Sequence, residues 1–336
     1  MLAALALGPL GCGGGGGGPR GGGGGAGSDG PNSQARIGMR TVLYLPNYKG
    51  DLSSWSQQLN FSNISYVNLS FLDVRADGSV SYSDGALPAF VRAAHAAGTK
   101  VCIAIGGATT IENGGPFATL LQDDQRAKLV DNLIAFVESN QLDCLDVDLE
   151  GNGVNAFYEA FVVELGARLQ PQQRELTAAV AGWFARGITA KSLETFDFIN
   201  VMAYDLYSAN NSTPMQTASI EAATAEVDKW VTERGVPREK VVYGVPFYGF
   251  SWALGTAEPQ PGKTVPYSDL LRLNRQAVQT QDQLQDSGSI TYLNSRATIQ
   301  AKARIGATYG GIMAWEGGQD ASGDDSLLQA VREAIE

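Results

Sequence analysis

The sequence predicts a single (β/α)8 barrel over residues 37–336, and three observations lead to this fold class. Eight apolar runs of strand length recur along this part of the chain. Segments with helical patterning lie between them, so strands and helices alternate. About 300 residues is also a suitable length for eight such units. A doubly wound open sheet, which has the same alternation, is the alternative.

The eight runs are rich in apolar residues, as strands buried on both faces are. They cover residues 40–45, 64–72, 100–107, 142–150, 175–183, 196–204, 240–249 and 309–315.

Two of the connections show apolar residues at helical spacing. These residues are Leu129, Val130, Leu133, Ile134 and Val137 in one, and Val154, Phe157, Tyr158, Phe161, Val162 and Leu165 in the other. We expect Asp123 or Asp124 to cap the first helix. The connection from 253 to 308 is longer than one helix requires, so it predicts an extended connection between the seventh and eighth barrel strands.

Residues 1–36 have a different composition from the rest of the chain. Residues 13–18 and 21–25 are all glycine, which is typical of a flexible linker. The preceding MLAALALGPLGC resembles a bacterial lipoprotein leader, with Cys12 as the candidate lipidated residue. We therefore expect export, as a cell-surface lipoprotein or, with a plain leader, as a secreted protein. The chain has no apolar run of about 18 residues that would span a membrane.

Charge and cysteine content exclude several classes of partner and site. The net charge is -11, with 24 Lys and Arg against 35 Asp and Glu, so a nucleic acid or an anionic membrane surface is not an expected partner. Three cysteines form neither a disulfide framework nor a zinc pattern. Cys102 and Cys144 lie in separate apolar runs, where a bridge is conceivable, but we expect buried free thiols. We expect a monomer.

The segment LDCLDVDLE, residues 142–150, carries the most unusual charge pattern. Asp146, Asp148 and Glu150 occupy alternate positions, so along a strand they share one face, while Leu and Val take the other. Neighbours in this row lie about 6.7 Å apart, and two charges at that distance repel by roughly 2.5 kcal/mol. We expect Asp146 and Asp148 to share a proton and the pKa of Glu150 to be raised, which suits a general acid.

The position of this row predicts a catalytic site. Glu150 ends its run before a Gly-Asn-Gly turn, and barrel enzymes carry their chemistry at the C-terminal ends of the strands. A solvated strand face and a magnesium site are the alternatives. The single histidine, His95, lies in a helical segment, which leaves little material for a triad or a histidine-ligated metal. Phosphate-binding loops are also missing, so we expect neither a metal nor a cofactor.

The pattern D-x-x-D-x-D-x-E, formed by Asp143, Asp146, Asp148 and Glu150, resembles the strand-four signature of the family 18 glycoside hydrolases, the chitinases and endo-β-N-acetylglucosaminidases. Further segments match this family in the same order along the chain. They are AIGG at 104–107, MAYD at 202–205, GVPFYG at 244–249 and GGIMAWE at 310–316. The resemblance therefore covers residues 40 to 316.

The resemblance implies roles for four catalytic residues. Glu150 protonates the glycosidic oxygen, and Asp148 orients the 2-acetamido group of the substrate. Asp146 lies beneath Asp148 and holds the proton, while Tyr204 hydrogen-bonds the acetamide carbonyl. That carbonyl is the nucleophile, so the reaction is substrate-assisted and retains the anomeric configuration, an exception to the usual scheme with two carboxylates.

The resemblance also implies substrate-binding and structural residues. Trp315 is the apolar surface beneath the sugar at the cleavage point. The other expected substrate-binding residues are Asp205, Met202, Tyr44, Phe71 and Tyr248. The residues assigned to the structural motif are Asp143, Gly106 and Gly107. Tyr207, Trp252 and Tyr248 are further candidates for exposed stacking surfaces, and packing within a helix or loop is the alternative for each.

Two positions depart from the family pattern. Ala104 stands where the family usually has serine, so Asp146 needs another partner, for which Tyr44 is the candidate. Leu149 replaces a common aromatic residue, but it should face away from the site.

These features predict an exported glycosidase that cuts β-1,4 bonds next to N-acetylglucosamine, in chitin or chitooligosaccharides. Its partner would be a polysaccharide or glycan that contains this sugar. The short extension predicts an open cleft with cleavage inside chains. The alternatives are an endo-β-N-acetylglucosaminidase acting on N-glycan cores and a non-catalytic, sugar-binding relative. Peptidoglycan is a less favoured substrate. A further alternative, outside this family, is a metal-dependent barrel enzyme.

Overall fold

The structure is a computed structural model that describes residues 39–207, 213–255 and 260–336. The expected leader, the glycine-rich linker and Cys12 lie outside the described residues, so export and lipidation stay predictions.

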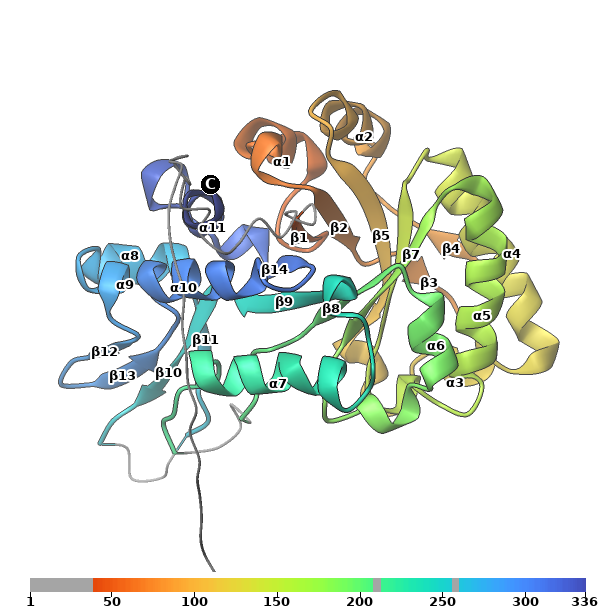
Figure 1. Cartoon of the computed structure of the whole chain (residues 1–336). Coiled ribbons are helices and arrows are strands. Elements are labelled where there is room, and N and C mark those ends of the chain that lie inside the picture. Colours follow the sequence, from red (N-terminus) through yellow and green to blue (C-terminus); the bar gives the residue numbers. More distant parts are fainter. Residues whose placement is uncertain (1–38, 208–212, 256–259) are drawn as a thin grey trace, which may run out of the picture. The chain divides into compact units, whose positions relative to one another are not determined.

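Eight parallel strands form a closed barrel, in the order β1-β14-β9-β8-β7-β6-β5-β2 (Figure 1). They are β1 (Arg40–Pro46), β2 (Tyr66–Ser70), β5 (Lys100–Gly107), β6 (Cys144–Leu149), β7 (Glu175–Val180), β8 (Phe198–Val201), β9 (Val241–Pro246) and β14 (Gly311–Trp315). The barrel closes because β1 pairs with β14, with Arg40 opposite Gly311. The predicted (β/α)8 barrel is thus confirmed, and the open sheet is ruled out.

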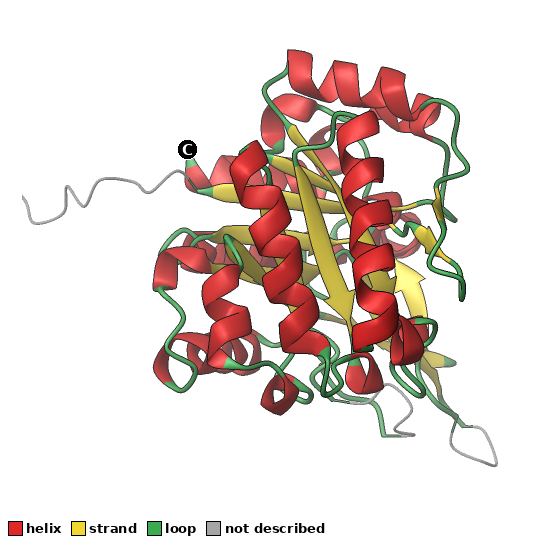
Figure 2. Cartoon of the chain, turned by 90° about the vertical axis from the view of Figure 1, so that its right-hand side faces the viewer, coloured by secondary structure: helices red, strands yellow, loops and turns green. Residues whose placement is uncertain are grey.

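Helices form a layer over the outside of the strands (Figure 2). They are α1 (Leu52–Gln58), α2 (Leu87–Ala96), α3 (Phe117–Leu120), α4 (Asp123–Ser139), α5 (Tyr158–Leu169), α6 (Ala190–Thr195), α7 (Ile220–Thr232), α8 (Tyr267–Asn274), α9 (Ala277–Thr280), α10 (Arg296–Gly306) and α11 (Leu327–Ile335). The predicted cap of α4 is wrong: Gln122 is the N-cap, and both expected aspartates lie in the first turn. Their negative charges still interact favourably with the positive end of the helix dipole there.

The long connection between β9 and β14 contains a small antiparallel sheet. Its order is β11-β10-β13-β12. The strands are β10 (Tyr248–Ala253), β11 (Lys263–Pro266), β12 (Gln283–Gln285) and β13 (Ser289–Tyr292). The predicted run 240–249 is therefore two strands, divided at Phe247, whose backbone N–H donates to Trp315 O at 2.7 Å. A further hairpin pairs β3 (Asp73–Val74) with β4 (Val80–Ser81).

The interior of the barrel contains a disulfide between Cys102 and Cys144. The register of β5 and β6 places these residues directly opposite each other, with their Cα atoms 4.4 Å apart and both side chains fully buried. The expectation of free thiols is therefore wrong. The sequence shows two cysteines in two runs, whereas the pairing depends on a register between strands that are 42 residues apart in sequence.

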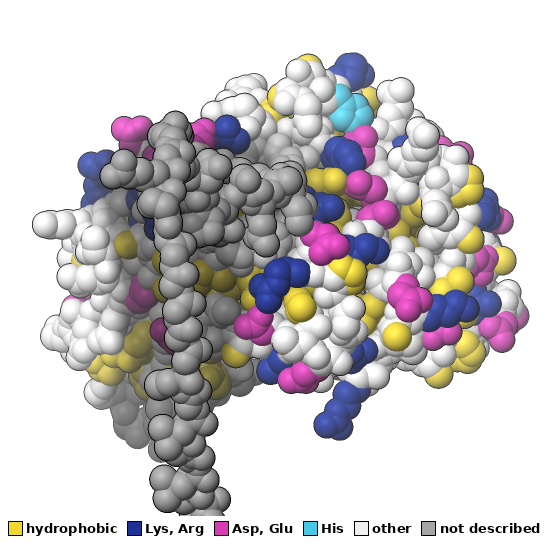
Figure 3. Space-filling model, in the orientation of Figure 1, with side chains coloured by type: hydrophobic (Ala, Val, Ile, Leu, Met, Phe, Trp, Pro, Cys, Tyr) yellow, Lys and Arg dark blue, Asp and Glu magenta, His cyan; other side chains and the backbone are white. Residues whose placement is uncertain are grey.

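Acidic and basic side chains are interspersed over the coloured part of the face seen in Figure 3. Such mixing is typical of a solvated protein surface. None of the helices in the described part of the chain is long and apolar enough to cross a membrane.

Candidate active site

Strand β6 carries its acidic residues into the barrel. Asp146 is fully buried and Asp148 is 4% exposed, while Leu145, Val147 and Leu149 pack in the apolar layer beneath the helices. The predicted alternation, including the outward direction of Leu149, is confirmed. Glu150 follows directly after the strand and is half-buried. The three carboxyl groups therefore form a column from the barrel interior to its mouth.

Asp146, at the floor of this column, receives three hydrogen bonds. Tyr44 Oη donates to Oδ2 at 2.6 Å, and Thr177 Oγ1 and Asn200 Nδ2 donate to Oδ1 at 2.5 and 3.3 Å. Ala104 offers no side-chain hydroxyl to Asp146, and the prediction that Tyr44 is the partner of Asp146 is confirmed. Burial raises the pKa of Asp146, and the donors oppose this rise by favouring the carboxylate.

Asp148 occupies the middle of the column and has a less complete set of partners. Its Oδ1 is buried without a hydrogen-bond partner among the described residues. Burial raises the pKa of Asp148 well above its usual range, and the charges of Glu150 and Asp146 raise it further. Because an unpaired buried carboxylate is costly, Asp148 is expected to hold a proton or to take a partner from a bound ligand.

Glu150, at the mouth, has the pKa expected of a general acid at neutral pH. Burial raises its pKa to about 7, and the charge of Asp205 contributes to the rise. The expected direction is confirmed. Its backbone N–H donates to Thr110 Oγ1 at 2.8 Å. The chain turns at Gly151, where φ is 50° and a Cβ would collide with the backbone of Ile111.

Tyr204, Asp205 and Met202 line the same region. Tyr204 is buried and its Oη lies 3.9 Å from Met313 Sδ, while Met202 is half-buried. Asp205 is exposed as a whole residue, but partial desolvation of its carboxyl group raises its pKa to about 6. Tyr248 Oη donates to Asp205 Oδ2 at 2.8 Å. The carboxyl group of Asp205 thus lies close enough to Glu150 to raise the pKa of Glu150.

Aromatic side chains close the opposite side of the barrel mouth. Trp315 and Phe71 are half-buried, with ring centroids 6.2 Å apart, and the ring of Tyr44 lies 5.5 Å from that of Trp315. Tyr44 itself is only 1% exposed. Its place is therefore beneath the site, where its hydroxyl supports Asp146, and the surface open to a substrate comes from Trp315 and Phe71.

Two of the three expected exposed stacking surfaces are not found. Tyr207 is 46% exposed, whereas Tyr248 and Trp252 are 6% and 1% exposed. Both buried rings lie on β10, which is covered by its neighbours β11 and β13. For these two rings the packing alternative holds, because β10 is an inner strand of the antiparallel sheet, which was not predicted from the sequence.

The residues assigned to the structural motif lie around the column. Asp143 precedes β6, where its Oδ2 accepts from Val101 N at 2.7 Å and lies 2.8 Å from His95 Nε2. At Gly106 and Gly107, φ is positive, and a Cβ would strike the Asp148 backbone or the Phe71 ring. Glycine is therefore required at both positions for close packing beside the site.

A cavity of about 420 Å³ opens beside Glu150. Its lining residues come from the segments that follow β6, β7 and β8, and from α7. They are Glu150, Ala181, Gly182, Trp183, Met202, Tyr204, Asp205, Leu206, Glu226 and Lys229. Trp183, which is 62% exposed, was not among the predicted site residues. Its position at the C-terminal end of a predicted barrel strand is the signal that could have found it.

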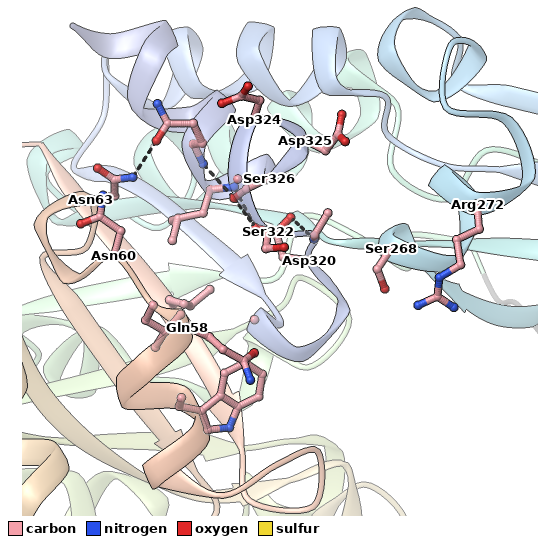
Figure 4. Close-up of a pocket in the computed structure, with 18 residues that line it drawn as sticks. Gln58, Asn60, Asn63, Ser268, Arg272, Asp320, Ser322, Asp324, Asp325 and Ser326 are labelled. Atoms are coloured by element: carbon pink, nitrogen blue, oxygen red, sulfur yellow. Dashed lines mark hydrogen bonds between the residues drawn. The ribbon is translucent and has the colours of Figure 1, made fainter.

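A larger cavity, of about 750 Å³, lies outside the barrel and away from the acidic column. Figure 4 shows its polar lining, with Gln58, Asn60 and Asn63 on one side and Asp320 and Arg272 among the residues on the other. The described residues include no group of three or more His, Cys, Asp or Glu that could hold a metal ion.

Comparison with known proteins agrees with this geometry. The family model described as "Glycosyl hydrolases family 18" matches residues 40–320. The crystal structure of the GH18 chitinase ChiB from Flavobacterium johnsoniae is 28% identical, has a TM-score of 0.78, and is matched over 88% of this chain and 94% of that one.

Two curated relatives show a more distant similarity. A "chitinase-like effector" of Moniliophthora roreri is 27% identical over 242 residues, which are 63% of this chain and 58% of that protein. The "Secreted chitinase LysM12" of Penicillium expansum is 25% identical over 267 residues, 69% of this chain but 18% of that protein. The match thus spans less than two thirds of either relative. The family model covers residues 40–320, which are most of this chain, and the chain therefore belongs to family 18 of the glycosyl hydrolases.

Proposed function

We propose that the protein hydrolyses β-1,4 bonds next to N-acetylglucosamine in chitin or chitooligosaccharides, by a substrate-assisted mechanism that retains the anomeric configuration. One observation carries the proposal most directly. Glu150, whose pKa is raised to about 7, stands at the barrel mouth above two buried aspartates. A carboxyl group that is partly protonated at neutral pH, and that is open to a ligand, is suited to protonate a leaving group.

In the proposed first step, the Glu150 carboxyl group donates its proton to the glycosidic oxygen, and the bond from this oxygen to the anomeric carbon breaks. The acetamide carbonyl oxygen of the same sugar forms a bond to that carbon, giving an oxazolinium ion. Asp148, whose Oδ1 lacks a partner among the described residues, would accept from the acetamide N–H. The protein thus orients a nucleophile that the substrate supplies.

In the second step, Glu150, now a carboxylate, takes a proton from a water molecule that attacks the anomeric carbon. The oxazolinium ring opens, and the product has the configuration of the substrate. Asp146 supports both steps from below, because three donors hold it in place. The Tyr204 hydroxyl would donate to the acetamide carbonyl and so stabilise the transition state.

Trp315 would form the surface beneath the sugar whose bond is cut. Its ring is half-buried against Tyr44 and Phe71, so its orientation is fixed before a substrate binds. Preorganised aromatic surfaces reduce the entropy lost on binding. Asp205 and Met202 would line the floor on the other side.

A non-catalytic role in sugar binding is the second candidate, because one relative is named a chitinase-like effector. Retention of the complete acidic column together with Tyr204 favours catalysis. Action on N-glycan cores uses the same chemistry and differs in the substrate alone. Export also belongs to the proposal, supported by the resemblance of the leader and by a relative named a secreted chitinase.

The test is hydrolysis of chitotetraose by the wild-type protein and by Glu150→Gln. Glutamine retains the shape of the side chain and removes the acidic proton. We expect shorter oligosaccharides from the wild type and almost none from the variant. If the wild type binds chitotetraose without cutting it, and also leaves a branched N-glycan core intact, the sugar-binding alternative replaces the proposal.

A further inference from the structure

The loop after β7 presents an exposed tryptophan next to the proposed general acid. Trp183 is 62% exposed, whereas Trp55, Trp230 and Trp252 are 8%, 1% and 1% exposed. The fifth tryptophan, Trp315, is half-buried. Trp183 also lines the cavity that contains Glu150. A large aromatic face left in water beside a polar cavity is suited to stacking on the apolar face of a sugar ring.

The backbone of this loop is held by a buried carboxyl group on α7. Glu226 is 6% exposed, and its Oε1 accepts from Gly182 N at 2.6 Å. Its Oε2 accepts from Lys229 Nζ at 3.0 Å. A Cβ at residue 182 would collide with Glu226 Oε1, so glycine is needed for this approach. The edge-on ring of Phe184, with centroids 4.8 Å apart, supports the Trp183 indole further.

The strand order places Trp183 on a particular side of the reaction. Strands β6 and β7 are neighbours, so Trp183 flanks Glu150, whereas β14, which carries Trp315, lies across the barrel from β6. If Trp315 lies beneath the sugar whose anomeric carbon reacts, the sugar on the leaving side of the bond extends past Glu150 toward Trp183. This step rests on the proposed function.

We propose that Glu226 is a positioning residue: by holding the Gly182 N–H, it fixes Trp183 as the stacking surface for the N-acetylglucosamine unit on the leaving side of the scissile bond. Glu226 acts through the backbone and does not take part in the chemistry. It sets affinity for substrates that extend past the cleaved bond.

The first test measures binding without turnover, in a Glu150→Gln background. Chitotetraose should change the tryptophan fluorescence, and Trp183→Phe should reduce that change, leaving the part that comes from Trp315. Adding Glu226→Ala should weaken binding about tenfold. Adding Glu226→Gln should retain the affinity, because the amide oxygen can still accept from Gly182 N. Glu233→Ala, which removes an exposed carboxylate at the C-terminal end of the same helix, is the matched control.

The second test separates positioning from general loss of structure. In the otherwise wild-type protein, Glu226→Ala should raise KM for chitotetraose about tenfold with little change in kcat. If Glu226→Ala does not fold, Gly182→Ala replaces it, because the added methyl group would push the Glu226 carboxyl group away from the backbone of residue 182 without removing a charged side chain. The expected change in KM is the same.

Three results would overturn the inference. Trp183→Phe could leave the sugar-induced fluorescence change intact. Glu226→Ala could bind chitotetraose as tightly as the Glu233→Ala control. Glu226→Gln could also be as impaired as Glu226→Ala, with kcat reduced in both. Failure of the proposed function has a different signature, because the wild type would then bind chitotetraose through Trp183 and release no products.

Discussion

The floor and the mouth of the acidic column differ in how their carboxyl groups are partnered. Asp146, at the floor, is fully buried and receives hydrogen bonds from Tyr44, Thr177 and Asn200. Glu150, at the mouth, is half-buried, and none of the described residues donates a hydrogen bond to its side chain. At the floor, the donors fix the geometry and oppose the rise in the pKa of Asp146 that burial causes. At the mouth, burial without donors raises the pKa, which prepares an acid.

The largest expected effect comes from removing the proton at the mouth. Glu150→Gln should lower kcat on chitotetraose about a thousandfold, which is within the range that general acids contribute. Asp143→Asn is the matched control, because Asp143 belongs to the same acidic motif but contacts His95 and the Val101 backbone. Equal losses in the two variants would show that the motif matters for structure and not for proton transfer.

A change in pH should reveal the same acid in the wild-type protein. Because the pKa of Glu150 is raised to about 7, its carboxyl group is protonated below that pH and ionised above it. The rate constant kcat/KM should therefore fall as the pH rises through about 7, by roughly tenfold per unit once Glu150 is ionised. A pH profile of chitotetraose hydrolysis tests this. A rate that is constant from pH 6 to about 9 would contradict it.

Weakening the floor should have a smaller effect. Tyr44→Phe removes the donor to Asp146 Oδ2 and should raise the pKa of Asp146 further, since that hydrogen bond lowers it. We expect a decrease of about tenfold in kcat and a loss of about 1 to 3 kcal/mol in unfolding free energy. Tyr66→Phe is the control, because its hydroxyl contacts Glu175 and not the column. Equal kinetics in the two variants would remove Tyr44 from the site.

The smallest effect concerns stability at the mouth. Burial of Glu150 favours its neutral form, so the folded state is penalised as the pH rises from the unfolded pKa of 4.5 through the folded value of about 7. At pH 8, the free energy of unfolding of Glu150→Gln should therefore be higher than that of the wild type by roughly 1 to 3 kcal/mol. The difference should vanish near pH 4, where both side chains are neutral. Urea unfolding at the two pH values measures it. A variant that is less stable at pH 8 would contradict the assigned penalty.

The sequence allowed the column to be predicted because its signal is local. Alternation within 142–150 indicates which residues face inward, and eight such runs indicate the barrel. The features that were missed depend on contacts between distant segments. The Cys102–Cys144 disulfide requires a register between two strands, and burial of Trp252 requires the pairing of β10 with β11 and β13.

The contact between Glu226 and the Gly182 backbone, which positions Trp183, was also not predicted from the sequence. The exposure of Trp183 follows from the turn at Gly182, and that turn depends on Glu226, which is 44 residues further along the chain. Local patterns contain no information about this contact. They do place Trp183 at the end of a barrel strand, which is where functional residues gather.

The most direct test of the proposed mechanism is the anomeric configuration of the first products. Chitotetraose would be hydrolysed by the wild-type protein inside an NMR spectrometer, with spectra taken before the anomers equilibrate. Substrate-assisted catalysis with Glu150 as the acid predicts that the β-anomer appears first. Initial release of the α-anomer would mean that water attacks the anomeric carbon directly, and would contradict the proposed role of the acetamide group.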